Sequence, residues 1–182
     1  FFNSIETDLD YGNEPHHGDS GPVTVRRHPK SAWREADHAW HDACVAAGFE
    51  FCADSNAPGT SGGVGSLTLN NVDRVRLSSA LTFLAQARGR PNLEIRGDCE
   101  VVRVVFDESG DEPRATGVEL GDGTVLSAGV EVVLSGGAIG SPHLLLRSGV
   151  GPSADLAAAG VESIRDIPGV GRSLRDHVAL PL

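Results

Sequence analysis

The sequence has no methionine and only one lysine, Lys30, beside fourteen arginines. Translation starts with methionine, and Phe1 is too large to follow a methionine that is normally removed. We therefore expect the chain to be an internal piece of a longer protein. It also has few aromatic residues, 5% of 182, whereas its 23 glycines predict many turns and close backbone approaches.

Long apolar runs, basic residues and cysteines are also few, and each lack argues against a class of protein. No apolar run approaches the roughly 20 residues of a membrane span, and there is no signal-peptide pattern at the start. The net charge of −10 argues against a nucleic-acid or membrane partner, because both need clustered basic residues. The odd cysteine count, with Cys44, Cys52 and Cys99, matches neither a zinc ligand set nor a disulfide framework. We expect reduced cysteines, a cytoplasmic protein and no metal site.

Apolar periodicity predicts helices over residues 31–47 and 79–88. The first carries an apolar stripe that includes Trp33 and Trp40, which we expect to pack in a core or against another domain. His38 and His41 lie three apart on this helix without a third ligand, so a solvated face is the expectation. Between the helices, the glycines of the loop 58–65 favour a substrate-entry or lid segment. His16 and His17 are read as features of a polar loop.

After residue 93 the pattern changes to strands. Three β-rich runs between residues 93 and 134 predict a β-meander, with the third strand at Val130–Leu134. A glycine turn and a helix follow, with Ser141 as the expected cap and Pro142 at the first helical position. The fold class is therefore α+β, a mixed α/β chain.

Two motifs carry a resemblance to a known family. Gly137-Ala138-Ile139-Gly140-Ser141-Pro142-His143-Leu144-Leu145-Leu146-Arg147-Ser148-Gly149-Val150-Gly151 resembles the second signature of the glucose–methanol–choline oxidoreductases. The segment 168–177 resembles the Pro-Gly-Val-Gly-x-Asn-Leu-x-Asp-His that follows it, with Ser173 in place of the usual Asn. A third match is Asn92-Leu93-Glu94-Ile95, which leads to Val101, Arg103 and Val104. Weaker matches are His17-Gly18-x-x-Gly21-Pro22, Asp54-x-Asn56 and Arg76-x-Ser78.

The resemblance implies an FAD-dependent enzyme that oxidises the CH–OH group of a small-molecule alcohol by hydride transfer to flavin. It implies that residues 1–90 belong to a substrate domain with a lid, 91–151 to an FAD-binding domain, and 152–182 to the substrate domain again. By the same match, the backbone of Val101 meets the adenine, and Gly136, Gly137 and Ala138 pack beside the adenosine half. The Gly-x-Gly-x-x-Gly loop that would hold the flavin pyrophosphate is missing from the sequence.

The resemblance places the family's catalytic histidine after residue 182, so no catalytic residue is assigned here. Adjacent Asp176 and His177 are expected to have a structural or flavin-proximal role, and His143 none in the chemistry. We expect the 182-residue chain alone to bind FAD weakly or not at all. Two alternatives stay open: a flavin-containing lyase of the same fold that performs no redox chemistry, and a stand-alone, non-catalytic binding module.

Overall fold

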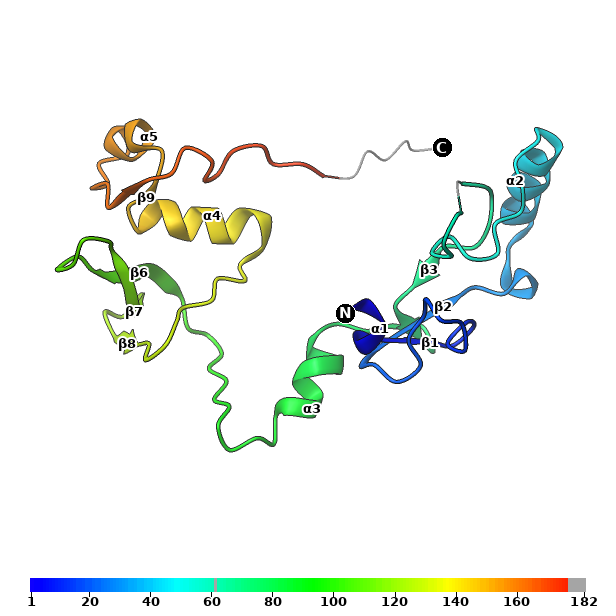
Figure 1. Cartoon of the computed structure of the whole chain (residues 1–182), viewed down its shortest axis with the longest axis horizontal. Helices are drawn as coiled ribbons and strands as arrows, with labels where there is room; N and C mark the ends of the chain where they lie inside the picture. Colours follow the sequence, from blue (N-terminus) through cyan, green and yellow to red (C-terminus); the bar gives the residue numbers. More distant parts are fainter. Residues whose placement is uncertain (61, 177–182) are drawn as a thin grey trace. The chain divides into compact units, whose positions relative to one another are not determined.

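The computed structural model describes residues 1–60 and 62–176. They form two compact units, one of residues Phe1–Glu94 and a second that begins at Ile95. Both contain helices and strands (Figure 1), which confirms the α+β class. Within the described residues, no helix combines the length and the apolar character that a bilayer crossing requires.

The first unit is built around short strands. Strand β1 (Glu6–Asp8) pairs in parallel with β2 (Val23–Arg27), and β2 pairs antiparallel with β3 (Thr68–Leu69). The other elements are α1 (Phe2–Ile5), the 3₁₀ turn η1 (Lys30–Ala32), α2 (Glu35–Ala46), the hairpin β4 (Asn71–Val72) with β5 (Val75–Arg76), the π-helical η2 (Ala80–Leu84) and α3 (Ala85–Ala87).

Helix α2 starts later than the sequence predicted. Arg34, not Ser31, precedes the helix, and its backbone N–H donates to the Asp37 carboxylate at 2.9 Å. Gly48 follows the helix with a φ of 93°, as expected of a left-handed C-terminal position. The stripe does not face a core of this unit, because Trp40 is 56% exposed. The buried residue of α2 is instead His41, so the expected solvated histidine face is wrong for His41.

The second unit contains a β-meander whose first two strands agree with the prediction and whose third strand lies earlier than predicted. Strands β6 (Val101–Asp107), β7 (Arg114–Leu120) and β8 (Val125–Ser127) pair antiparallel in this order. Helix α4 (Gly137–Arg147) lies along β6 (Figure 1). It is followed by β9 (Val150–Gly151), α5 (Ser153–Ala158) and β10 (Arg165–Asp166), with β9 and β10 parallel. The buried apolar side chains lie here: Val104, Leu120, Val150 and Leu156.

Two boundaries in this unit differ from the prediction. Residues 130–134 form no strand, and Val130 and Val133 are 87% and 73% exposed. An apolar strand needs a neighbour for its backbone groups, and no strand among the described residues pairs with this run. Helix α4 begins at Gly137, so that Pro142 lies inside it. Ser141 is therefore not the predicted N-cap but lies inside the helix, where its hydroxyl accepts the Gly136 N–H at 2.9 Å.

A buried hydroxyl joins α4 to the meander. Ser148, 4% exposed, accepts the backbone N–H of Val104 at 2.8 Å and donates to the Leu144 carbonyl at 2.6 Å. Val104 lies on the free edge of β6, because β6 is the first strand of its sheet. This hydroxyl therefore satisfies a strand amide that has no ladder partner and fixes the helix on the edge strand.

Candidate functional site

Two of the residues predicted to face FAD line the same hollow at the start of α4. Val101, the first residue of β6, and Gly136 line one hollow of about 340 Å³, together with Val118, Leu134 and Leu144 among others. Ala138 lines a second hollow of about 250 Å³, which it shares with Gly171 and Arg172 of the second family motif. The structure thus brings Val101 close to Gly136, 35 positions away in sequence. It also brings Gly171 and Arg172 of the second motif against α4, which the first motif forms.

The glycines of this bend are required by the chain itself. A Cβ on Gly136 would lie 2.9 Å from the Ser141 nitrogen and 3.0 Å from the Gly140 carbonyl carbon. Gly137 has a φ of 74°, a conformation that other residues rarely adopt. The prediction had attributed both glycines to the nearness of a ligand. The turn geometry accounts for them without one, so the contact with FAD stays a prediction.

The bend nevertheless has room for a ligand. Gly136, Gly137 and Ala138 are exposed, and a Cβ on Gly137 would meet no atom within 4 Å. Next to the bend, β6 presents an edge without a neighbouring strand among the described residues. Backbone N–H and C=O groups on such an edge can bind a ligand whatever the side chain is. Val101 and residues 136–138 could therefore hold part of a nucleotide.

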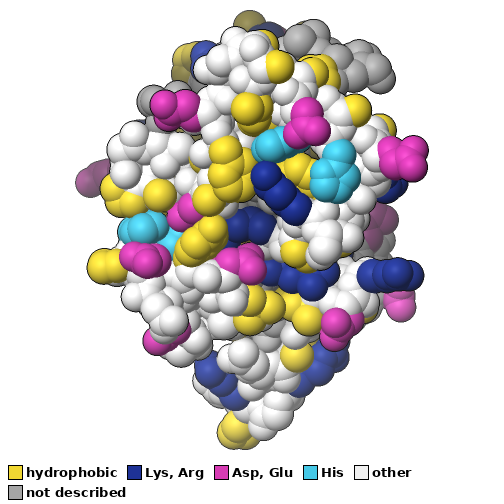
Figure 2. All heavy atoms as spheres, turned by 90° about the vertical axis from the view of Figure 1, so that its right-hand side faces the viewer, with side chains coloured by type: hydrophobic (Ala, Val, Ile, Leu, Met, Phe, Trp, Pro, Cys, Tyr) yellow, Lys and Arg dark blue, Asp and Glu magenta, His cyan; other side chains and the backbone are white. Residues whose placement is uncertain are grey.

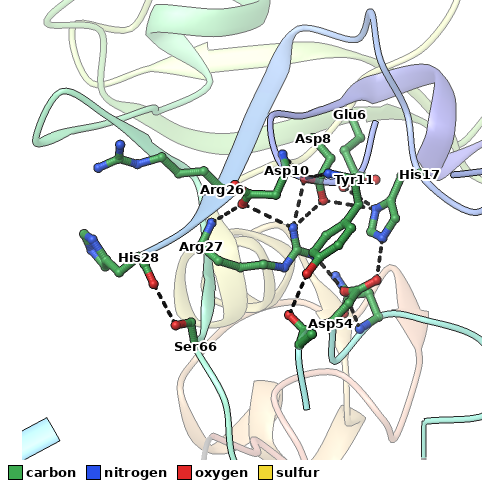
Figure 3. Close-up of polar contacts among 12 residues, drawn as sticks. Glu6, Asp8, Asp10, Tyr11, His17, Arg26, Arg27, His28, Asp54 and Ser66 are labelled. Atoms are coloured by element: carbon green, nitrogen blue, oxygen red, sulfur yellow. Dashed lines mark hydrogen bonds and ion pairs between the residues drawn. The ribbon is translucent and has the colours of Figure 1, made fainter. Parts of the chain in front are cut away.

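The first unit contains a buried ionic network that the sequence analysis missed (Figure 3). The Arg27 guanidinium lies between two carboxylates: one nitrogen donates to both Asp8 oxygens at 2.9 and 2.7 Å, and another to Asp54 Oδ1 at 2.7 Å. Arg27 and Asp8 are 7% and 4% exposed. Tyr11 covers the guanidinium, whose carbon lies 4.6 Å from the ring centre. The ion pairs join β1, β2 and the loop that starts at Asp54.

His17 extends this network. Its Nε2 lies 2.8 Å from Asp54 Oδ2, and its Nδ1 lies 3.1 Å from both Glu6 Oε1 and Asp8 Oδ2. The neighbouring glycines place it there: a Cβ on Gly18 or Gly21 would come within 2.5 Å of the backbone of residues 3–6. Two weak family matches, His17-Gly18-x-x-Gly21-Pro22 and Asp54-x-Asn56, therefore meet in space.

The network shifts the pKa values of its members. Burial alone would raise the pKa of Asp8, but hydrogen bonds from Arg27, Tyr11 and Asp10 outweigh burial and hold it below 3.8. For Asp54, hydrogen bonds from His17, Asn56, His16 and Arg27 likewise overcome burial and keep the pKa well below 3.8. Burial lowers the pKa of His17, yet its hydrogen bonds to Asp54 and Glu6 raise it above 6.5 overall. The ionised forms are therefore favoured.

Other histidines have minor places. His41 packs on Trp33, with ring centres 5.2 Å apart, and its Nε2 lies 3.4 Å from Lys30 Nζ. His143 is exposed on α4. His177 lies outside the described residues, so its expected role stays a prediction. One signal in the sequence could have located the network: Val23, Val25 and Arg27 alternate along β2, which places Arg27 on the same face as two valines.

Comparison with known proteins identifies the class. The family model described as GMC oxidoreductase matches residues 2–179. A GMC-type oxidoreductase of Rhodococcus erythropolis is 40% identical over the whole chain, and a 5-(hydroxymethyl)furfural oxidase of Methylovorus sp. is 36% identical over 99% of it. An oxygen-dependent choline dehydrogenase of Serratia proteamaculans is 39% identical over the whole chain. The chain spans about a third of these relatives, namely 36%, 34% and 33% of their lengths.

A solved structure agrees with this assignment. Pyridoxine 4-oxidase from Mesorbium loti superposes with a TM-score of 0.79 at 33% identity, over 92% of this chain and 32% of that one. The chain belongs to the glucose–methanol–choline (GMC) oxidoreductase family, as its two motifs predicted. Membership makes FAD the implied cofactor.

The adjacent arginines of β2 provide a matched test of the ion pairs. The variant Arg27→Ala leaves Asp8 buried without its partner, so we expect the first unit to lose about 3–5 kcal/mol of unfolding free energy. Arg26→Ala removes only a 3.4 Å hydrogen bond to Asn71 and should cost less than about 1 kcal/mol. Urea unfolding of the 182-residue chain, followed by the fluorescence of Trp33 and Trp40, reports on this unit. Equal losses in the two variants would contradict the assignment.

The pKa shifts also predict a pH dependence. Stability from Asp8 and Asp54 is present above pH 3.8 and is lost as the pH falls toward their folded-state values. Stability from His17 is complete below pH 6.5 and is lost as the pH rises through its folded-state pKa. We therefore expect the first unit to be most stable between about pH 3.8 and pH 6.5. The buffer contains EDTA, so that metal ions do not compete with protons for His17.

The variant His17→Gln, which cannot be protonated, should lose the alkaline decline but keep the acid one. His38→Gln, at an exposed position on α2, should behave like the parent chain. The measurement is the urea midpoint as a function of pH. A parent chain and a His17→Gln variant that decline in parallel above pH 6.5 would refute the role of His17.

Proposed function

We propose that the full-length protein is an FAD-dependent oxidoreductase that oxidises the CH–OH group of a small-molecule alcohol. The observation that supports this most directly is the meeting of Val101 and Gly136 at one hollow in a chain of the GMC family. Several relatives are named for compounds such as 5-(hydroxymethyl)furfural and choline. These compounds differ widely, so the proposal extends to the class of substrate and not to one alcohol.

In this proposal, the second unit holds the adenosine half of FAD. The open edge of β6 offers the backbone groups of Val101 to the adenine, whose edge carries both donors and acceptors. The exposed bend at Gly136, Gly137 and Ala138 leaves space beside the ribose, because two of its three residues have no side chain. Bound FAD supplies the hydride acceptor. The chain's own contribution is to position the cofactor.

The remaining functions are divided between this chain and the rest of the protein. No residue of this chain is proposed as catalytic, since by the resemblance both the pyrophosphate loop and the catalytic histidine lie outside these 182 residues. We propose that residues 1–90 and 152–182 contribute to the substrate domain and residues 91–151 to the FAD-binding domain. Three free cysteines suit a cytoplasmic protein, which is the location we propose.

An anaerobic titration of the full-length protein tests the function. At least one alcohol from a panel of small alcohols should bleach the flavin absorbance. Hydride transfer from this alcohol reduces the flavin, which stays reduced because no electron acceptor is present. A protein that retains FAD but is reduced by no alcohol would favour the non-redox lyase. A protein that binds no FAD would favour the non-catalytic binding module.

Two alanine-to-leucine substitutions test the position of the cofactor in the same protein. Ala138→Leu enlarges an exposed side chain at the proposed adenosine contact, so FAD should bind about tenfold or more weakly, a loss of about 1.4 kcal/mol. Ala157→Leu makes the same change at an exposed position of α5 and should leave FAD binding unchanged. Equal FAD affinity of the two variants, measured by fluorescence quenching, would contradict the proposed contact.

A further inference from the structure

Three side chains of the first unit present ligand atoms of the kind that a transition metal ion binds. His16 Nε2 lies 3.3 Å and His17 Nε2 2.8 Å from Asp54 Oδ2, and the three atoms lie within 4.8 Å of one another. The His17 and Asp54 side chains are 1% and 9% exposed, whereas that of His16 is 26% exposed and gives access from solvent. The cluster lies wholly within the first unit.

The hydrogen bonding of His17 points to a cation. A neutral imidazole has one N–H and one lone pair, so it can donate to a carboxylate from only one nitrogen. His17 has carboxylate oxygens at both nitrogens: Glu6 and Asp8 at Nδ1, and Asp54 at Nε2. If Nδ1 carries the proton, the lone pair of Nε2 faces Asp54 Oδ2 at 2.8 Å. Either a second proton or a metal ion must then lie on the Nε2 side.

The charge around His17 favours a divalent ion over a single proton. The cluster holds four carboxylates and one guanidinium. Asp8, Asp10 and Asp54 lie 2.7–3.6 Å from Arg27 nitrogens, and Glu6 lies 3.1 Å from His17 Nδ1. Protonation of His17 leaves two negative charges in excess, and a divalent ion leaves one. Uncompensated charge in a buried cluster is costly, so the second arrangement is better balanced.

We propose that His16 Nε2, His17 Nε2 and Asp54 Oδ2 bind one divalent transition metal ion, with zinc as the best match. Two imidazoles and a carboxylate suit zinc and its neighbours, whereas magnesium and calcium prefer all-oxygen sites. Glu6 and Asp8 accept from Nδ1 of His17, the arrangement that commonly orients a metal-binding histidine. No metal site was expected from the sequence, because His16 and His17 have the pattern of loop residues.

The two distances to Asp54 Oδ2 are close to those that a metal ion requires. Tetrahedral zinc with ligands at about 2.0–2.2 Å places neighbouring ligand atoms about 3.3–3.5 Å apart. The distance from His16 to Asp54 already agrees, and the distance from His17 to Asp54 must open by roughly half an ångström. The ion would tie the turn before β2 to the loop that begins at Asp54. It would therefore act in the structure of the first unit, and no role in FAD binding is assigned to it.

Zinc titration of the metal-stripped, FAD-loaded full-length protein tests this site. We expect His16→Gln to bind one zinc fewer per chain, or to bind it at least about tenfold more weakly. His16 is half-buried and not part of the Arg27 ion pairs, so this variant should keep its fold and its flavin absorbance. His28→Gln, an exposed histidine outside the cluster, is the matched control and should bind zinc like the parent.

A second variant examines the carboxylate behind His17. Glu6→Gln keeps an acceptor for Nδ1 but removes the charge, so zinc should bind about tenfold more weakly. Isothermal titration calorimetry gives the affinity, and elemental analysis after dialysis gives the stoichiometry. Equal zinc stoichiometry and affinity in the parent, His16→Gln and His28→Gln would overturn the proposal. A parent protein that binds no zinc at about 100 μM free metal would also overturn the proposal, because its dissociation constant would then lie well above this concentration.

Discussion

The Arg27 guanidinium between Asp8 and Asp54 is the interaction on which the first unit depends. It connects three segments that are far apart in sequence, β1, β2 and the loop from Asp54, through contacts of 2.7–2.9 Å. No buried apolar side chain is found among the described residues of this unit; those that are buried are polar, namely Asp8, His17, Arg27, His41 and Thr82. Ion pairs and hydrogen bonds are therefore the buried side-chain interactions of this unit, and removal of one partner leaves an uncompensated buried charge.

Several large apolar side chains of this chain are exposed to solvent. Figure 2 shows one face on which hydrophobic side chains lie between basic and histidine side chains. Trp40, Phe49, Phe51 and Leu67 are each more than half exposed. The chain spans about a third of its relatives, and exposed apolar groups of this kind mark surfaces that interact with other parts of a protein or with partners. The same reasoning applies to Val130 and Val133, which have the composition of a buried strand.

The second unit is organised around a different constraint, the glycine bend before α4. Ser148 holds α4 on the edge of β6, and the bend at Gly136 and Gly137 turns the chain into this helix. Together they place Val101 beside Gly136 and leave the outer side of the bend exposed. A rigid edge strand next to an exposed bend is well suited to hold a flat ligand. It links the packing of this unit to the proposed binding of FAD.

The sequence predicted the parts of the fold that local patterns determine. The α+β class, the meander and the family were recoverable, because strand periodicity, turn residues and the fifteen-residue motif are local. The strand at 130–134 was not, since a strand depends on neighbours that the run itself does not specify. The start of α4 was misplaced because Pro142, usually a first-turn residue, lies at its sixth position. The network of Arg27 and His17 was missed because its members meet only in three dimensions.

The proposed function depends most on the contact between the bend of the second unit and the adenosine half of FAD. A crystal structure of the full-length protein with bound FAD measures this directly. We expect the adenine to hydrogen-bond with the backbone of Val101 at about 2.7–3.2 Å, and the ribose to lie beside Gly136, Gly137 and Ala138. An adenosine half bound elsewhere, with the bend covered by the protein's own side chains, would contradict the account.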